Sequence, residues 1–300
     1  MSAAVSRFGH VAIVGRPNVG KSTLVNRLVG QKITITAPKP QTTRHRITGI
    51  VTEPRGQIVL IDTPGLHRGG KDALNRQLNR TARSALEGVD LVLFLVQAGQ
   101  FGEEDETVLR LLESVDAPVV LVVNKVDLVN DKTELLPFLA QMGQKADFAE
   151  IYPMSARRQR GLDGLLDLMF SYLPEGEPGY DEDQVTTAPV RFMAGEIVRE
   201  KLARSLHDEL PYQTTVSIER FEETPDLVTI GAVIYVARAG QKGIVIGQKG
   251  ARLKTVGQQA RESIEQLLGK RVMLDLWVKV HDDWADDERS VAALGYQLPE

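Results

Sequence analysis

Gly15-Arg16-Pro17-Asn18-Val19-Gly20-Lys21-Ser22 decides the fold of the first half of the chain. The stretch fits the pattern G-x-x-x-x-G-K-[ST], in which glycines let backbone N–H groups turn toward phosphate oxygens. An apolar run, Val11–Val14, precedes it, and a helical pattern, Lys21–Val29, follows it. Lys21 supplies charge for the β- and γ-phosphates, and the Ser22 hydroxyl is a hard ligand for Mg²⁺. We therefore predict that all eight residues line a bound nucleotide, and companion motifs weaken the alternative of a chance glycine turn.

The first half of the chain alternates apolar runs with helical patterns, which predicts an α/β fold with a mainly parallel sheet covered on both faces. The expected strands are 11–14, 47–52, 57–61, 91–96, 119–123 and 151–154, and the expected helices are 21–29, 105–113 and 162–172. Leu173–Val185 interrupts this rhythm with prolines, glycines and five acidic residues, so we interpret it as an exposed linker.

The second half has a different order of elements, which predicts a smaller α+β domain. A helix (192–209), two strands (213–220 and 228–238), a helix (251–267) and a final strand (272–280) are expected. The predicted boundaries are a first domain at 1–173, a linker at 174–189, and a second domain with a C-terminal tail at 190–300.

Two further motifs of the first half point to the phosphates and their metal. In Asp62-Thr63-Pro64-Gly65, a carboxylate at a strand end is suited to the Mg²⁺ shell, through water, and the Gly65 N–H has room to approach a γ-phosphate. Gln41-Thr42-Thr43-Arg44 lies in a polar loop, where a threonine hydroxyl can bind Mg²⁺ and its N–H the γ-phosphate. We favour Thr43 over Thr42 for this role.

Guanine is predicted by the tetrapeptide Asn124-Lys125-Val126-Asp127, which follows a buried strand. A carboxylate at Asp127 accepts from both N1–H and the 2-amino group of guanine, and adenine lacks this donor pair. The wrong base leaves the acid unpaired, which costs several kcal/mol. The Asn124 amide is expected to fix the loop and meet N7, the Lys125 stem to cover the base, and the N–H groups of Ser155-Ala156 to reach O6.

The residue after Gly65 is Leu66, which is also predicted to contact the nucleotide. Signalling GTPases place a water-orienting glutamine at this position, and an apolar side chain cannot orient water. Asn18 is therefore either a ligand for K⁺ beside the phosphates, neutralising developing charge, or the donor of a loop-shaping hydrogen bond. The expected catalytic residues are Asn18, Lys21, Thr43, Asp62 and Gly65.

Composition excludes several classes of function. The chain has no cysteine, so disulfides, Cys-ligated zinc and thiol catalysis are excluded. No apolar run reaches the ~18 residues of a spanning helix, and residues 1–7 lack the apolar core of a secretory signal. We expect a cytoplasmic protein. The net charge of −4 gives no global sign of nucleic-acid binding.

Charge is nevertheless uneven along the chain. Residues 238–271 contain eight Lys and Arg residues and only two acidic residues, Glu262 and Glu265. The turn Gly247-Gln248-Lys249-Gly250 lies in this island, after Ile246 and before a helix carrying Arg252 and Lys254. A G-x-x-G turn in this order of elements is typical of KH domains, where it clamps a single-stranded backbone. We predict RNA binding by residues 246–250 with Arg252 and Lys254, whereas a solvated helix face would explain the charge alone.

Taken together, these motifs resemble the bacterial Era GTPase family. The similarity extends over nearly all 300 residues and includes Arg191-Phe192-Met193 to Lys201-Leu202, Glu209-Leu210-Pro211-Tyr212, Leu276–Val280 and Trp284–Arg289. The resemblance implies a P-loop GTPase domain followed by a type II KH domain. It also implies binding to the 3′ end of 16S rRNA, a role in maturing the 30S subunit, and a peripheral inner-membrane fraction. We expect a monomer that does not bind DNA.

Two rival functions stay open at this level. One is a membrane- or division-linked GTPase switch whose second domain binds protein. The other is a nucleotide sensor that does not hydrolyse GTP, which Leu66 motivates.

Overall fold

The computed structural model resolves the chain into two units, each with its own sheet. The structure describes residues 6–37, 39, 42–65, 72–206 and 210–296. The first unit comprises Met1–Thr34, Thr43–Gly70 and Leu78–Thr187, and the second comprises Ile35–Thr42, Lys71–Gln77 and Ala188–Glu300.

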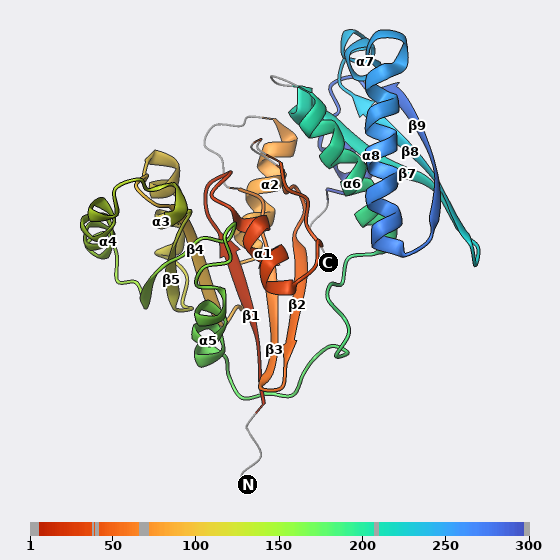
Figure 1. Ribbon diagram of the computed structural model, residues 1–300. Coiled ribbons are helices and arrows are strands. Elements are labelled where there is room, and N and C mark those ends of the chain that lie inside the picture. Colours follow the sequence, from red (N-terminus) through yellow and green to blue (C-terminus); the bar gives the residue numbers. More distant parts are fainter. Residues whose placement is uncertain (1–5, 38, 40–41, 66–71, 207–209, 297–300) are drawn as a thin grey trace. The chain divides into compact units, whose positions relative to one another are not determined.

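The first unit is built on a six-stranded sheet of order β2-β3-β1-β4-β5-β6, in which only the β2–β3 pair is antiparallel (Figure 1). Its strands are β1 (Arg7–Val14), β2 (Ile47–Glu53), β3 (Gly56–Asp62), β4 (Leu91–Gln97), β5 (Val119–Asn124) and β6 (Glu150–Pro153). Its helices are α1 (Lys21–Val29), α3 (Glu103–Leu112), α4 (Leu135–Gly143) and α5 (Leu162–Tyr172), together with α2 (Ala73–Ser84) from Leu78 onward.

The central strands of this sheet are buried, which explains their continuous apolar sequences. Every residue of β3 is buried, as are the first six residues of β4. Parallel sheets covered on both faces have this pattern, because neither side of the strand meets water. The carboxyl ends of β1, β3 and β5 lead directly into Gly15, Thr63 and Lys125. The predicted nucleotide motifs therefore share one edge of the sheet.

Residues 174–187 are mostly exposed, but their backbone is tied to the first unit. Glu175 bridges to Arg7, and Thr186 bridges to Gly49. The buried Gln57 side chain donates to the Tyr180 carbonyl at 3.0 Å and accepts from the Gly179 and Tyr180 N–H groups, each at 3.0 Å. This segment is therefore a fixed strap along the sheet rather than a free tether.

The second unit contains a three-stranded sheet of order β7-β8-β9 with helices against one face (Figure 1). The β7–β8 pair is antiparallel, and the β8–β9 pair is parallel. A parallel pair needs a crossover, which α7 and α8 supply. The elements are α6 (Val190–Ser205), β7 (Thr214–Glu223), β8 (Leu227–Val236), α7 (Ala239–Ile246), α8 (Ala251–Leu268), β9 (Arg271–Val280) and α9 (Glu288–Ala293).

A buried tryptophan holds the segment after β9 onto this unit. Trp284 is fully buried, stacks on Tyr296 with ring centroids 6.0 Å apart, and donates from Nε1 to the Gln213 carbonyl at 3.1 Å. The Tyr296 and Thr215 hydroxyls lie 2.8 Å apart. Both aromatic residues thus bury their rings and satisfy their polar atoms.

Four helices of the structure are absent from the sequence-based expectation: α2, α4, α7 and α9. Helix α7 contains two glycines and α9 has six residues, so neither shows a clear helical period. Helix α2 is rich in Arg, Asn and Gln, although Leu74, Leu78 and Ala82 lie buried at helical spacing. Among the described residues, no helix has the length and apolarity to cross a bilayer.

Candidate nucleotide site and nucleic-acid groove

The phosphate loop depends on glycines at two positions where no side chain fits. A Cβ on Gly15, which has φ +151°, would lie 2.4 Å from the Leu95 carbonyl oxygen. A Cβ on Gly20, with φ +109°, would lie 2.4 Å from Asn124 Nδ2. The loop is thus pressed against β4 on one side and the predicted guanine motif on the other, so its curvature is set by packing.

Lys21 is buried at the centre of this loop. Its Nζ donates to the Gly15 carbonyl at 2.8 Å and to the Arg16 carbonyl at 3.1 Å. Burial lowers the pKa of Lys21 to about 8, and the charge of Asp62 opposes this shift. An anionic phosphate at the loop would restore the stability of the ammonium form, which fits a phosphate-binding lysine.

Three oxygen-bearing side chains meet beside Lys21. The Ser22 Oγ and Thr43 Oγ1 atoms are 2.7 Å apart, and Thr43 Oγ1 donates to Asp62 Oδ2 at 3.5 Å. Asp62 Oδ1 is buried without a hydrogen-bond partner in the described part of the chain. Burial raises the pKa of Asp62 to about 6, opposed by the charge of Lys21. A hard cation would satisfy this orphaned oxygen, so the donor set fits Mg²⁺.

The structure places the two candidate threonines differently. Thr43 is buried beside Ser22, whereas the Thr42 hydroxyl donates to the Lys39 carbonyl at 2.6 Å and the Ala37 carbonyl at 3.3 Å. Only Thr43 therefore has its hydroxyl at the metal donor set.

The residues after Asp62 pack onto the phosphate loop. Thr63 donates from Oγ1 to the Ile13 carbonyl at 2.8 Å, and Pro64 is buried. A Cβ on Gly65 would lie 2.9 Å from Pro17 Cγ and 3.0 Å from Pro17 N, so this glycine lets the switch segment approach the loop. Leu66 lies outside the described residues.

Arg16 is held by a residue that the sequence patterns did not single out. Its Nε donates to Asp105 Oδ2 at 3.0 Å, and the same oxygen accepts from the Gly102 N–H at 3.0 Å. Asp105 thus caps the start of α3 and fixes the arginine of the phosphate loop. Its position in the acidic first turn of a helix is the signal that could have found it. The Arg16 side chain is therefore tied to α3, which leaves its backbone N–H as the group it can offer to a phosphate.

Asn124 connects three of the predicted motifs through one buried amide. Its Nδ2 donates to the Val19 carbonyl at 2.8 Å, and its Oδ1 accepts from the Ala156 N–H at 3.0 Å. The Ser155 N–H donates to the Arg160 carbonyl at 3.1 Å. The two N–H groups expected at guanine O6 are thus hydrogen-bonded within the protein, so the expected contact to O6 is not preformed.

Lys125 and Asp127 stand at the opening of the base site. Lys125 has φ +63°, and its Nζ donates to the Asn18 carbonyl at 2.6 Å and to Gln97 Oε1 at 2.8 Å. Burial lowers the pKa of Lys125. The Ser155 hydroxyl donates to Asp127 Oδ1, and the Val126 N–H donates to the Met154 carbonyl at 3.2 Å. These bonds orient the Asp127 carboxylate before any base arrives.

Asn18 is the exposed corner of the phosphate loop. It has φ +62°, a left-handed conformation that is uncommon outside glycine, and its carbonyl accepts from Lys125. The residue is exposed, so its carboxamide is open to solvent.

The predicted RNA turn has an unusual backbone and lies at the end of a groove. Gly247, Lys249 and Gly250 have φ of +75°, +49° and +79°. A groove of about 550 Å³ runs from this turn between α8 and β9. It is lined by Gly250, Leu253, Lys254, Gly257, Gln258, Arg261, Leu274 and Leu276. The floor is apolar and the rim is basic, which suits stacked bases and a phosphate backbone.

Several predicted RNA residues lie apart from this groove. The Arg252 guanidinium donates to the Ile244 carbonyl, and Ile246 packs against the domain core. Gly257 and Leu276 are groove residues that the sequence patterns missed: a Cβ on Gly257 would lie 3.3 Å from Leu276 Cδ1. A glycine in the middle of a basic helix was the available signal.

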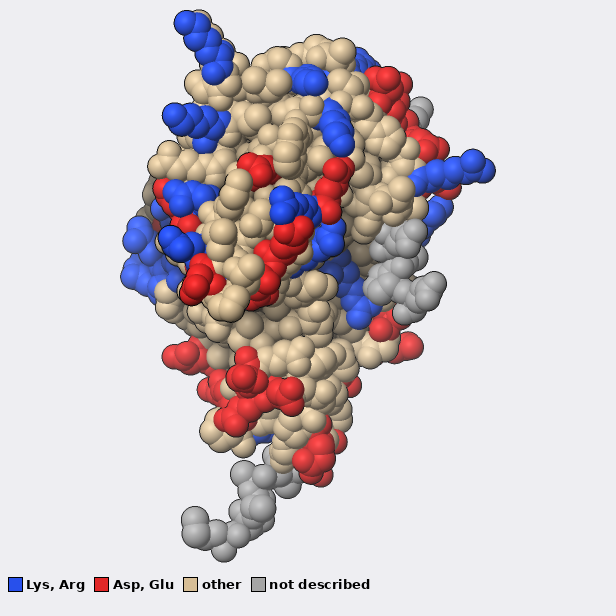
Figure 2. All heavy atoms as spheres, turned by 90° about the vertical axis from the view of Figure 1, so that its right-hand side faces the viewer, with Lys and Arg blue, Asp and Glu red and all other residues tan. Residues whose placement is uncertain are grey.

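Figure 2 shows Lys and Arg side chains that stand out from the drawn face, with Asp and Glu side chains lying among several of them. Within the basic island, Lys270 pairs with Glu223 at 2.6 Å and Arg261 with Glu265 at 3.1 Å. Lys249 and Lys254 form no ion pair with any described residue, so both are available to an anion.

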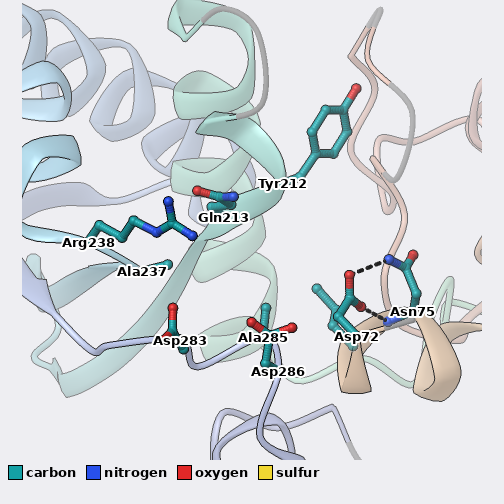
Figure 3. Close-up of a pocket in the computed structure, with 10 residues that line it drawn as sticks. Asp72, Asn75, Tyr212, Gln213, Ala237, Arg238, Asp283, Ala285 and Asp286 are labelled. Carbon is teal, nitrogen blue, oxygen red and sulfur yellow. Dashed lines mark hydrogen bonds between the residues drawn. The ribbon is translucent and has the colours of Figure 1, made fainter. Parts of the chain in front are cut away.

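A second hollow, of about 220 Å³, lies in the second unit between the start of α2 and the residues after β9 (Figure 3). Asp72 caps α2 by accepting from the Asn75 N–H and Nδ2, each at 2.7 Å. The Leu74 N–H donates to the Ala285 carbonyl at 2.9 Å. No group of three or more His, Cys, Asp or Glu among the described residues is placed to hold a metal.

Comparison with known proteins matches both halves of the chain. A family model described as "50S ribosome-binding GTPase" matches residues 10–125, and a KH domain model matches residues 209–285. GTPase Era of Xanthomonas oryzae pv. oryzae is 52% identical over 99% of both chains, and GTPase Era of Xanthomonas campestris pv. campestris is 54% identical over 97% of both.

Two solved structures share the architecture. Aquifex aeolicus Era bound to GDP and AlF₄⁻ has a TM-score of 0.94 and 39% identity, over 97% of this chain and 100% of its own. Era in complex with MgGDPNP and nucleotides 1506–1542 of 16S ribosomal RNA has a TM-score of 0.95 and 39% identity, over 98% of this chain and 100% of its own.

Fold, motifs and matches together define a P-loop GTPase followed by a KH domain, which confirms the expected fold class. These matches make the chain a GTP-hydrolysing enzyme. At this identity over the full length, the chain belongs to the Era GTPase family, as its motifs indicated.

We expect Asp127→Asn to exchange the base preference from guanine to xanthine, because the amide offers a donor where guanine also presents donors. GTP affinity should fall at least ~100-fold, about 2.7 kcal/mol, and xanthosine triphosphate should become the better ligand. Competition binding against a fluorescent GDP measures both. Asp131→Asn, at an exposed cap of the following turn, is the matched control. Retained preference for GTP in Asp127→Asn would contradict the assignment.

Proposed function

We propose that this chain uses GTP binding and hydrolysis to control its hold on the 3′ end of 16S rRNA during maturation of the 30S subunit. The observation that carries the proposal is that one chain holds both a buried phosphate and metal donor set and a basic groove ending in a G-x-x-G turn. The relative solved with MgGDPNP and a 16S rRNA segment supports it.

On the nucleotide side, each residue has a distinct role in the proposal. Lys21 and the loop N–H groups bind the phosphates, while Ser22, Thr43 and, through water, Asp62 hold Mg²⁺. The metal, when bound, neutralises charge on the β- and γ-phosphates. The Gly65 N–H and the Thr43 N–H meet the γ-phosphate, so both are lost as contacts once GTP is hydrolysed. Asp127 selects guanine.

Hydrolysis also requires stabilisation of charge that develops between the phosphates. The chain has Leu66 where a water-orienting glutamine is expected, so we propose that a K⁺ ion held by the exposed Asn18 side chain supplies part of this stabilisation. A cation held there would take the place of an arginine finger.

We expect GTP turnover in K⁺ buffer to exceed that in Na⁺ buffer at equal ionic strength by at least ~10-fold, about 1.4 kcal/mol of barrier. Asn18→Asp keeps an oxygen ligand and should keep the preference for K⁺, whereas Asn18→Ala should remove it. Phosphate release at saturating GTP is the measurement. Equal rates in the two buffers would assign Asn18 a loop-shaping role instead.

RNA binding is proposed for the groove between α8 and β9. The left-handed Lys249 and its flanking glycines let the turn approach a sugar–phosphate backbone closely. Leu274 and Leu276 offer apolar surface to bases, and Lys254 and Arg261 stand at the rim. KH domains clamp about four nucleotides of a single strand in this way.

We expect Lys249→Glu combined with Lys254→Glu to weaken binding of a 16S rRNA 3′-end oligonucleotide at least ~100-fold and to leave GTP affinity unchanged. Loss of two phosphate contacts should also reduce the salt dependence of the residual binding, by a slope of about 1.4 on a log–log plot. Arg110→Glu with Lys132→Glu, both exposed on the first unit, changes net charge equally and is the control. RNA affinity that survives the groove pair but falls in the control pair would contradict the KH assignment.

The 30S subunit as the working partner and a peripheral inner-membrane fraction are proposed from the family resemblance. Fractionation of cells that produce the chain tests both. We expect it to co-sediment with 30S particles in the GTP-analogue state and with membranes at low salt, with the Lys249→Glu, Lys254→Glu variant losing only the 30S peak. Absence from both fractions would contradict these two assignments and leave the enzyme assignment intact.

A further inference from the structure

The last residue of β4 is a glutamine that belongs to none of the predicted nucleotide motifs. Gln97 is partly buried, and its Oε1 accepts a hydrogen bond from Lys125 Nζ at 2.8 Å. Both residues lie in the first unit, within the stretch Leu78–Thr187. Neither the metal donor set nor the contacts expected for guanine include this glutamine, so its carboxamide has no role yet in the nucleotide site.

The register of the sheet places Gln97 beside the predicted guanine motif. Strands β4 and β5 are parallel neighbours, and Gln97 pairs with Asn124 where both strands end (Figure 1). The Ala98 N–H donates to the Asn124 carbonyl at 2.8 Å, which extends this pairing by one residue. Lys125 follows directly. The backbone of a central strand therefore fixes Gln97 next to the residue whose side chain it binds.

Two consecutive residues of the guanine motif bind two consecutive carbonyls of the phosphate loop. Asn124 Nδ2 donates to the Val19 carbonyl at 2.8 Å, and Lys125 Nζ donates to the Asn18 carbonyl at 2.6 Å. The asparagine does so with a short, buried amide. The lysine does so with a flexible four-carbon stem, which loses much conformational entropy when it is fixed. The second of these bonds therefore benefits from a further acceptor on the lysine.

Gln97 supplies that second acceptor from a different element of the sheet. With Nζ bound to both the Asn18 carbonyl and Gln97 Oε1, the methylene stem of Lys125 is restricted between its Cα and its ammonium. A stem restricted before binding offers its apolar surface to a base at a lower entropic cost. A lysine without this restraint would lose its freedom only when the nucleotide binds, and the weaker affinity would appear as faster release.

We propose that Gln97 is a positioning residue for guanine nucleotides, which holds the Lys125 stem in place for the base and so slows nucleotide release. It acts through Lys125 rather than on the nucleotide. The inference rests on the predicted placement of Lys125 against the base. It adds a residue of β4 to a guanine site otherwise formed by the motif after β5 and by Ser155-Ala156.

The test measures the release of a fluorescent GDP from the full chain with Gln97→Met or Gln97→Glu. Methionine has a similar length but offers only a weak sulfur acceptor, whereas glutamate keeps an oxygen acceptor for Lys125. Gln141→Met, at an exposed position of α4 in the same unit, is the matched control. Lys125→Ala, alone and combined with Gln97→Met, completes a double-mutant cycle that isolates the coupling between the two side chains.

For Gln97→Met we expect the rate constant of GDP release to rise ~10-fold, because a hydrogen bond to a charged group is lost. The value of kcat at saturating GTP should stay unchanged. Gln97→Glu and Gln141→Met should release GDP at the parental rate. In the Lys125→Ala background, Gln97→Met should add no further increase.

Parental release in Gln97→Met would overturn the inference. An equal increase with and without the lysine side chain would also overturn it, because the effect would then not pass through Lys125. Parental release in Lys125→Ala would overturn the placement of Lys125 against the base, and the role of Gln97 with it.

Discussion

The buried amide of Asn124 is the interaction on which the nucleotide site depends. It is the one described side chain that bonds to both the phosphate loop, at Val19, and the loop at Ala156. Gly20 has no side chain because Asn124 Nδ2 occupies the space where a Cβ would stand. Removing the amide would leave a buried N–H and a buried carbonyl unpaired, each at a cost of ~1–3 kcal/mol. Phosphate and base recognition are therefore built on one bond network.

The Lys21 ammonium and the Asp62 carboxylate of the same site are both buried, and this burial favours ligand binding. Burial lowers the pKa of Lys21 and raises that of Asp62, and Asp62 Oδ1 has no partner among the described residues. Folding alone leaves these groups imperfectly satisfied, and a phosphate with a hard cation would satisfy both. The strain at Asn18 and Lys125, where φ is positive, belongs to the same arrangement. At these positions the folded protein without ligand is less stable than it could be, and ligand binding would restore that stability.

Sequence patterns predicted most of this fold because its strands are long apolar runs and its motifs require specific residues at fixed spacings. Helices α1 and α5 begin and end where the periodicity places them. Helix α7 was not predicted because its glycines conceal the helical period. The role of Asp105 was not predicted because its partner Arg16 is distant in sequence. The groove residues Gly257 and Leu276 come from two separate elements, and only the packed domain brings them together.

Because position 66 is a leucine, GTP hydrolysis in the proposed mechanism depends on residues other than a water-orienting glutamine. Without a side chain at that position to orient water, precise placement of the remaining groups matters more, because misplacement by about 1 Å costs up to ~100-fold in rate. Thr43 contributes two of these groups from one residue, a hydroxyl and an N–H. The Thr43 hydroxyl lies 2.7 Å from the Ser22 hydroxyl, so the fold already holds it at the proposed metal site. The absence of a glutamine at position 66 thus places more demand on how precisely the folded site holds Thr43.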